Sequence, residues 1–220
     1  MFPTRFQMQL EHGFCVGVTL PSLAEVNNEE ALFSTTHPDE VRFASEFALR
    51  RKITFAGGRR AMAVALEHMG HSASPILSDD RGAPLMPSGF VGSLSHKDAL
   101  AVALVASDEN ACVGVDIEPL EPERPRITRL VLTDSERRAL GDGPPWREVL
   151  LRFSLKESIY KAIDPFVRRY VTFKEVEVTP QPNGEVKIQL QLERGEALNV
   201  AGRWIEHEGY FITTCRASRR

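Results

Sequence analysis

The run CVGVDI occupies residues 112–117 and is followed by Glu118. Its apolar, β-branched composition predicts a buried strand. Asp116 and Glu118 are two residues apart at the end of this strand, so their carboxylates should project from one face and could chelate a hard cation together. An isolated pair of acids at a strand end is more often merely solvated, so the interpretation needs support from the rest of the sequence.

A second set of charged residues lies on the helix predicted for residues 146–163. Glu157 and Lys161 are four residues apart and share one helical face, which by default means a surface ion pair. Ser154 with Glu157 could also form a capping box. The apolar pattern continues upstream through Val149, however, which places Ser154 inside the helix and favours a carboxylate that is free for other chemistry.

Lysines flank this carboxylate at positions 156 and 161. A divalent cation together with two lysines is what a diphosphate requires for binding, and for stabilising charge on a departing phosphate. These residue types would therefore suit a site that binds a diphosphate.

In the first half of the chain, a helix is predicted from Pro38 to Met69, with an interruption at Gly57-Gly58. Residues 74–89 are rich in proline, glycine and aspartate and predict a loop. Two apolar runs, 90–94 and 100–106, then predict a hairpin whose tip presents the polar residues 95–98.

The second half repeats this order of helix and strands. Thr133 and Glu136 predict a capping box that opens a short helix, and Asp164-Pro165 should end the longer one. An Asn183-Gly184 turn predicts a hairpin. The strands predicted here are residues 171–178, 186–192, 198–205 and 210–215.

We therefore expect an α+β fold, a pseudo-dimer of two similar α/β lobes with antiparallel sheets and a cleft between them. The expected domains are residues 1–110 and 111–220.

Composition excludes several classes of protein. The 220 residues are 42% hydrophobic and 26% charged with a net charge of −3, which is unlike a nucleic-acid-binding protein. The three cysteines are widely spaced and suggest neither disulfides nor zinc. No apolar run reaches the roughly 18 residues that a membrane span requires. We expect a cytoplasmic protein.

Basic residues gather between positions 50 and 60. Helical charge runs usually face solvent. Arg51 and Arg59 are about two turns apart, however, so both could face one phosphate-bearing ligand. His96 follows Ser95 in the predicted hairpin, and a single histidine of this kind is more often structural than functional.

The order of these motifs resembles the 4′-phosphopantetheinyl transferase family, in its monomeric, two-lobed, enterobactin-synthase-like branch. Five stretches carry the resemblance: RKITFAGGRR (51–60), GAP (82–84), GSLSH (92–96), VGVDIE (113–118) and FSLKESIYKA (153–162). The resemblance implies transfer of the 4′-phosphopantetheine group of coenzyme A to a serine of an apo carrier protein, with release of 3′,5′-ADP. It leaves open whether the carrier serves fatty-acid, polyketide or nonribosomal-peptide synthesis.

The resemblance also implies roles for individual residues. Asp116, Glu118 and Glu157 would bind Mg²⁺, or Mn²⁺ in its place, and Glu157 would also act as the base. Lys156 and Lys161 would contact the diphosphate, and the N-terminal lobe would bind the nucleotide. The residues implied in nucleotide binding are Arg51, Arg59, Arg81, Gly82, Pro84, Ser95 and His96. The acceptor surface would include Arg124, Arg126, Arg129 and residues 166–169.

Two alternatives remain at this point. A metal-dependent phosphohydrolase acting on nucleotides would use similar acids and cations. A non-catalytic subunit that binds coenzyme A is the other, although such a subunit would have no need of all three acids and Lys161.

Overall fold

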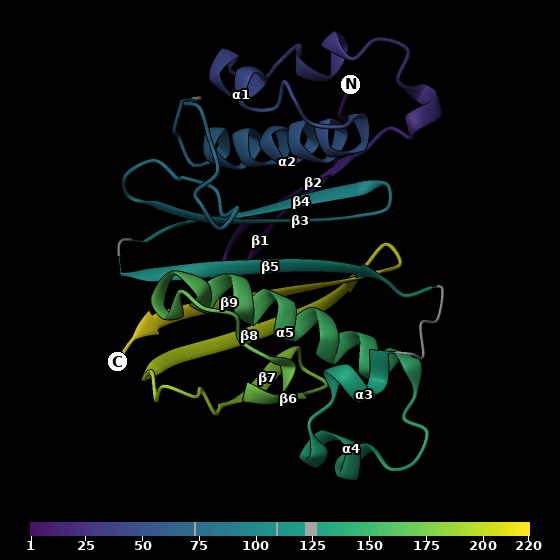
Figure 1. The fold of residues 1–220 in the computed structure, drawn as a ribbon, viewed down its shortest axis with the longest axis vertical. Helices are drawn as coiled ribbons and strands as arrows, with labels where there is room; N and C mark the ends of the chain where they lie inside the picture. Colours follow the sequence, from purple (N-terminus) through teal and green to yellow (C-terminus); the bar gives the residue numbers. More distant parts are fainter. Residues whose placement is uncertain (73, 109, 122–126) are drawn as a thin grey trace. The chain divides into compact units, whose positions relative to one another are not determined.

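The computed structural model describes residues 1–72, 74–108, 110–121 and 127–220. The chain forms two compact units, Met1–Glu109 (unit 1) and Asn110–Arg220 (unit 2), so the division falls one residue before the expected one. Each unit contains an antiparallel sheet and one long helix (Figure 1). The expected α+β class is confirmed.

Unit 1 is built on a four-stranded sheet in the order β1-β2-β4-β3. Its strands are β1 (Thr4–Leu10), β2 (Gly13–Thr19), β3 (Phe90–Lys97) and β4 (Leu100–Ser107). Helix α2 (Leu49–His68) packs on this sheet, and apolar residues of the helix and of β2 and β4 form the core. The shorter helices are η1 (Leu23–Glu25), η2 (Glu30–Phe33) and α1 (Pro38–Phe43).

The predicted helix break at Gly57-Gly58 is wrong. Helix α2 continues through both Gly57 and Gly58. Gly57 permits close packing, since a Cβ at this position would lie 2.2 Å from Leu20 Cδ2. The break in the predicted helix lies upstream, between α1 and α2. Strands β1 and β2 were not predicted at all.

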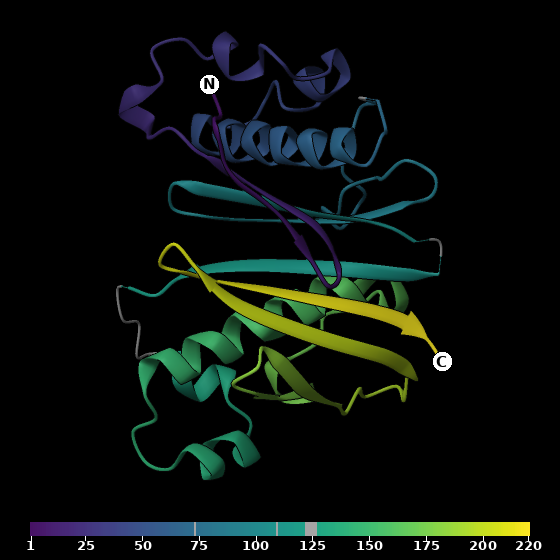
Figure 2. The same ribbon diagram turned by 180° about the vertical axis from the view of Figure 1, so that it is seen from behind.

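Unit 2 contains a five-stranded sheet in the order β5-β9-β8-β7-β6. Its strands are β5 (Ala111–Pro119), β6 (Val176–Pro180), β7 (Glu185–Leu190), β8 (Leu198–His207) and β9 (Tyr210–Arg219). The long antiparallel pair β8–β9 is clearest from behind (Figure 2). The helices among the described residues of this unit are α3 (Thr128–Val131), α4 (Asp134–Leu140), α5 (Trp146–Val167) and η4 (Phe173–Glu175).

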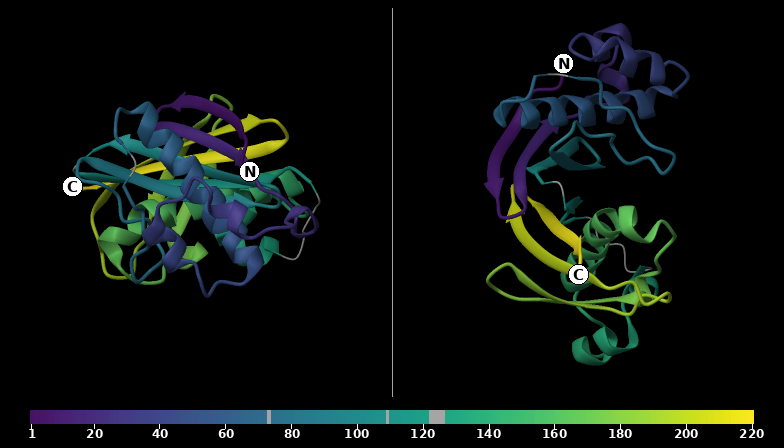
Figure 3. Two further views of the ribbon diagram at one scale, coloured as in Figure 1. Left: turned by 90° about the horizontal axis from the view of Figure 1, so that it is seen from above. Right: turned by 90° about the vertical axis from the view of Figure 1, so that its left-hand side faces the viewer.

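Helix α5 covers one face of this sheet, as α2 does in unit 1 (Figure 3). The predicted helix end at Asp164-Pro165 is wrong, since α5 runs through Pro165 to Val167. A proline so close to the end costs only one intrahelical hydrogen bond. The capping box of α4 is confirmed, and so is the Asn183-Gly184 turn, where Gly184 has φ +84°. The strand predicted from residue 171 begins only at Val176, after η4.

The close approach of α5 to β5 depends on Gly114. A Cβ at this position would lie 1.9 Å from the carbonyl oxygen of Ser158 and 2.9 Å from the backbone nitrogen of Ala162. Both are main-chain atoms of α5, which cannot move without shifting the helix. Gly114 therefore sets the distance between helix and strand.

Cys15, Cys112 and Cys215 are free thiols, and two of them are buried. Across the described ranges, none of the helices combines the length and apolar character needed to cross a membrane.

We predict that Gly114→Ala lowers the free energy of unfolding by about 3 kcal/mol, because overpacking forces α5 away from β5. Differential scanning calorimetry would measure the change. Gly58→Ala is the matched control: its Cβ would meet only Leu94 at 3.6 Å, and alanine is favoured within helices. An equally stable Gly114→Ala variant would contradict the proposed contact.

Candidate active site

The acidic pair of β5 faces helix α5. Gly114, which lies against Ser158, fixes the face that points to the helix, and alternation along the strand puts Asp116 and Glu118 on the same side. The two acids are only 5% and 7% exposed. Carboxylates this buried require charged or hydrogen-bonding partners.

Two residues of α5 hold Asp116. Ser154 Oγ donates a hydrogen bond to Asp116 Oδ2 at 2.8 Å, and Lys161 Nζ donates to Asp116 Oδ1 at 2.9 Å. Lys161 also donates to the carbonyl oxygen of Val115 at 2.8 Å. Thr213, opposite Asp116 on β9, donates to the carbonyl oxygen of Ser154 at 2.9 Å. The Asp116 carboxylate is thus fixed at both oxygens.

Glu157 lies on the same face of α5 as these partners. It follows Ser154 by three residues and precedes Lys161 by four, so all three side chains share one helical face. Glu157 is half-buried. Burial, and secondarily the charge of Glu157, raises the pKa of Tyr160, so the phenol stays protonated beside the site.

The chemistry of these donors suits a hard divalent cation. Asp116, Glu118 and Glu157 offer only oxygen ligands and bring three negative charges against the single positive charge of Lys161. Within the described ranges, no three acidic, histidine or cysteine side chains are assembled closely enough to be recognised as a metal site. Binding of a metal ion by Asp116, Glu118 and Glu157 therefore stays a prediction, which the oxygen atoms of these three side chains suit.

Lys156 contradicts its predicted role. Its side chain is completely buried and pairs with Glu136 Oε2 at 2.7 Å. It also donates to the carbonyl oxygens of Val131 at 2.8 Å and Phe173 at 3.0 Å. All three donors of the ammonium group are therefore used inside unit 2, and none remains for a diphosphate.

Arg59 in unit 1 is also more buried than its predicted role suggests. It is 5% exposed, donates to Ser78 Oγ at 2.9 Å and lies over the ring of Phe55 at 4.4 Å. Desolvation lowers its pKa to about 10, the charge of Glu40 opposes this, and the charge of Arg51 adds to it. The two guanidinium groups thus repel each other, which an anion bound beside them would relieve.

The loop that Arg59 contacts is well formed. Asp79 Oδ1 accepts the backbone N–H groups of Arg81 and Ala83, each at 2.9 Å, and Gly82 adopts φ +86°. Ser78 and Pro84 form an isolated bridge across the turn. Arg81 and Gly82 are exposed, so this turn presents its backbone and one cationic side chain to solvent.

Ser95 and His96 belong to strand β3 and not to the hairpin tip, which contains Asp98 and Ala99. Consecutive strand residues point to opposite faces, so the two side chains diverge. His96 shares the face of Leu94, which packs against Gly58 of α2. His96 therefore lies on the helix-covered face and Ser95 on the other, so the structure does not bring these two predicted ligands together.

Sequence reasoning missed Ser154 and Thr213 as supports of Asp116. The sequence suggests for Ser154 only a possible role as a helix cap, whereas the structure buries it fully in the helix interior. A buried serine on the face that carries Glu157 and Lys161 was the available signal. The supporting role of Thr213 depends on its pairing opposite Asp116 in the sheet, which the sequence alone does not show.

Comparison with known proteins identifies the family. The model described as "4′-phosphopantetheinyl transferase N-terminal domain" matches residues 39–106, and the "4′-phosphopantetheinyl transferase superfamily" model matches residues 112–215. The chain is 30% identical over 191 residues to 4′-phosphopantetheinyl transferase Svp of Streptomyces mobaraensis, covering 82% of this chain and 78% of that protein. The chain belongs to the 4′-phosphopantetheinyl transferase superfamily.

Two further similarities are found among known proteins and solved structures. Enterobactin synthase component D of Salmonella typhimurium is 29% identical over 201 residues, covering 87% of this chain and 82% of that protein. A solved structure titled "Chronobacterium ammoniagenes ACPS-CoA complex" is 24% identical with a TM-score of 0.41, covering 51% of this chain and 99% of that one.

Only part of the surface predicted to receive the protein partner lies within the described residues. Arg124 and Arg126 lie outside the described residues. Arg129 is exposed and Phe166 is half-buried. Arg169 is instead engaged within unit 2, with Nη2 2.6 Å from Glu175 Oε2 and Nε 3.3 Å from Glu196 Oε1.

We predict that Glu136→Gln lowers the free energy of unfolding by about 3–5 kcal/mol, because it leaves Lys156 charged and buried without its partner. Chemical denaturation followed by circular dichroism would measure this. Asp134→Asn, which breaks the exposed pair with Arg137 on the same helix, should change stability by no more than about 1 kcal/mol. Equal effects of the two variants would contradict the buried pair.

We also predict a dependence of stability on Glu175 at low pH. Burial alone would raise its pKa, but hydrogen bonds from Arg169 and from the backbone N–H groups of Thr172 and Glu193 outweigh burial and hold it at about 2, against an ordinary 4.5. The folded pKa is depressed, so this stabilisation is full above about pH 4.5 and is lost as the pH falls toward 2.

The comparison is between unfolding curves of the wild type and Glu175→Gln at several pH values. The variant should be less stable at pH 7, and the difference should shrink between pH 4.5 and pH 2. A difference that stays constant over this range would contradict the assignment.

Proposed function

We propose that this chain transfers the 4′-phosphopantetheine group of coenzyme A to a serine hydroxyl of an apo acyl, aryl or peptidyl carrier protein, with release of 3′,5′-ADP. Membership of the family supports the reaction. The observation that carries the proposal for this chain is the fixed Asp116 carboxylate, held by Ser154 and Lys161 on the helical face that also bears Glu157.

Asp116, Glu118 and Glu157 are the proposed ligands of Mg²⁺, for which Mn²⁺ could substitute. The bound ion would neutralise the diphosphate of coenzyme A and polarise its non-bridging oxygens. The bond from Ser154 orients Asp116 before any ligand binds, and supporting bonds of this kind tune a metal-binding carboxylate.

Glu157 is the proposed general base, directly or through one water molecule. It takes the proton of the carrier serine while the serine oxygen attacks the phosphorus atom attached to pantetheine. A new P–O bond forms as the bond to the departing 3′,5′-ADP breaks. Lys161 is 30% exposed at its side chain and is the proposed group that stabilises charge on the leaving phosphate.

Arg51 and His96 are the proposed ligands of the 3′-phosphate. In β3, Gly92 lies near Met62 of α2 and Leu94 lies near Gly58, so the next residue on this face, His96, is carried toward the first turns of the helix, where Arg51 lies. We propose that Arg59 mainly supports the loop through Ser78, and that the exposed turn at residues 81–84 borders the adenine.

We propose that the protein acts as a monomer in the cytoplasm. The three free thiols, two of them deeply buried, suit a reducing compartment. The exposed Arg129 is a candidate contact for an acidic carrier protein.

The test is mass spectrometry of an apo carrier protein after incubation with enzyme, coenzyme A and Mg²⁺. The wild type should add one phosphopantetheine per carrier. Asp116→Asn and Glu157→Gln should slow this at least about 100-fold, because one removes a metal ligand and the other the base. Glu148→Gln, in the first turn of the same helix, is the matched control and should keep full activity.

Two outcomes would contradict the proposal. One is full transfer activity in both variants while circular dichroism shows them folded. The other is rapid cleavage of coenzyme A by the wild type without any carrier protein, which would indicate a phosphohydrolase.

A further inference from the structure

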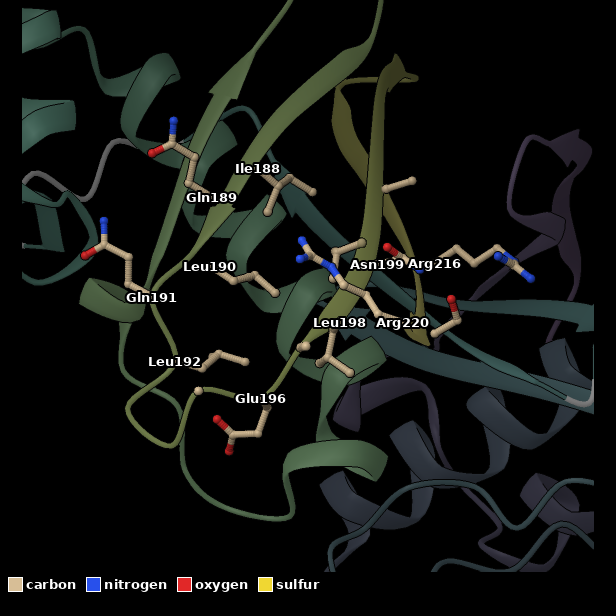
Figure 4. A pocket seen from close by; sticks show the side chains of 15 residues that line it. Ile188, Gln189, Leu190, Gln191, Leu192, Glu196, Leu198, Asn199, Arg216 and Arg220 are labelled. Atoms are coloured by element: carbon tan, nitrogen blue, oxygen red, sulfur yellow. The ribbon is translucent and has the colours of Figure 1, made fainter.

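Strands β7 and β8 separate soon after they pair. Their register contains Glu185↔Arg203 and Val186↔Gly202, and in the described part of the chain it extends no further toward the connecting loop. Beyond these pairs the strands border a groove of about 710 Å³, within the range of about 300–1,000 Å³ typical of ligand sites. Figure 4 shows Ile188 and Leu190 on one side of it and Leu198 and Asn199 on the other.

The main chain of both strands points into this groove at every second residue. On β8, the N–H of Trp204 donates to the carbonyl of Gly184, so even-numbered residues face β7. On β6, the N–H of Val178 points away from β7 and donates to Glu136. Val178 and Ile188 are paired across β6 and β7, so the N–H and C=O groups of Ile188 point away from β6 and toward β8. The backbone edges facing the groove are therefore those of Ile188, Leu190, Leu198 and Val200.

Ionic and hydrogen bonds keep the hairpin open by tying its loop away from the sheet. Glu175 Oε2 accepts the N–H of Glu193 at 3.1 Å, and Arg169, just after α5, joins Glu175 to Glu196. Leu192 packs into the core of unit 2 and is 8% exposed. The splayed hairpin is thus a built feature and not a frayed end.

The two faces of the groove differ in chemistry. Toward α5 the lining is apolar, since Ile188, Leu190 and Val200 pack against the core. On the outer face the lining is polar and cationic, with Arg216 and Arg220 both exposed. Arg216 is opposite Ala201 in the register of β8 and β9, which places its charge beside the groove.

We propose that this groove binds an extended segment of a partner protein in which apolar and acidic residues alternate. The main chain of the segment bonds to the strand edges of β7 and β8, as in other complexes formed by strand addition. Its apolar side chains face the core, and its carboxylates face Arg216 and Arg220. This proposal is independent of the proposed transferase reaction.

Strand edges and charge complementarity together favour this occupant. A compact ligand would leave most of the edge N–H and C=O groups unused, whereas an extended chain presents matching groups at every second residue. Because one face of the groove is apolar and the other is polar and cationic, the side chains of the bound segment should alternate between apolar and acidic. Arginine pairs strongly with carboxylates, which selects acidic residues for the outer face.

The test uses the full chain and a fluorescein-labelled, end-capped peptide of sequence Val-Glu-Val-Glu-Val-Glu-Val. Fluorescence anisotropy should show saturable binding. Arg220→Glu should weaken it at least about tenfold, because one attractive contact becomes repulsive. Lys187→Glu is the matched control: Lys187 is exposed on β7 but does not line the groove, so binding should be unchanged.

Hydrogen exchange followed by NMR separates strand addition from simple attraction of charges. Peptide binding should slow exchange of the amides of Ile188, Leu190, Leu198 and Val200. A peptide N-methylated at alternate residues should bind at least about tenfold more weakly, since it loses edge hydrogen bonds.

Four results would overturn the proposal. The first three are the absence of saturable binding, binding without slowed exchange at these amides, and equal weakening by Arg220→Glu and Lys187→Glu. Competition by a single-stranded oligonucleotide with equal effectiveness would likewise overturn it, since the arginines would then recognise phosphate and not a peptide.

Discussion

The contact between Asp116 and helix α5 is the interaction on which the rest of unit 2 depends. A carboxylate that is 5% exposed is costly unless both oxygens are satisfied, and here Ser154 and Lys161 satisfy them. Those bonds form only because Gly114 lets α5 approach β5 closely. Strand β5 and helix α5 therefore hold each other in place, and the Asp116 carboxylate is held between them.

Helix α5 carries two lysines that serve different purposes. Lys161 reaches Asp116 of β5, whereas Lys156 is enclosed by Glu136 and two carbonyl groups. They are five positions apart, so at about 100° per residue they point roughly 140° apart around the helix. One face of α5 carries the residues proposed for the chemistry, and another anchors the helix to the segments that precede and follow it.

Buried glutamates perform a second kind of anchoring in both units. Glu40, Glu136 and Glu175 each occupy the third position of a short helix and close its capping box. Each also accepts a bond from a distant segment: from the N–H of Ile76, from the N–H of Val178, and from the N–H of Glu193. Short helices that could not be stable alone are thereby held to the fold, and Glu175 also keeps the β7–β8 hairpin open.

The sequence alone determined what depends on neighbours along the chain: the strand with Asp116 and Glu118, the helix with Glu157 and Lys161, the Thr133–Glu136 cap and the Asn183-Gly184 turn. Tertiary structure decided the rest. It buried Lys156 and extended α5 past Pro165. It also directed the side chains of Ser95 and His96 to opposite faces of the sheet and brought Ser154 to Asp116, 38 residues away in the sequence. Local patterns report periodicity and propensity, but which face is buried, and against what, depends on contacts between distant segments.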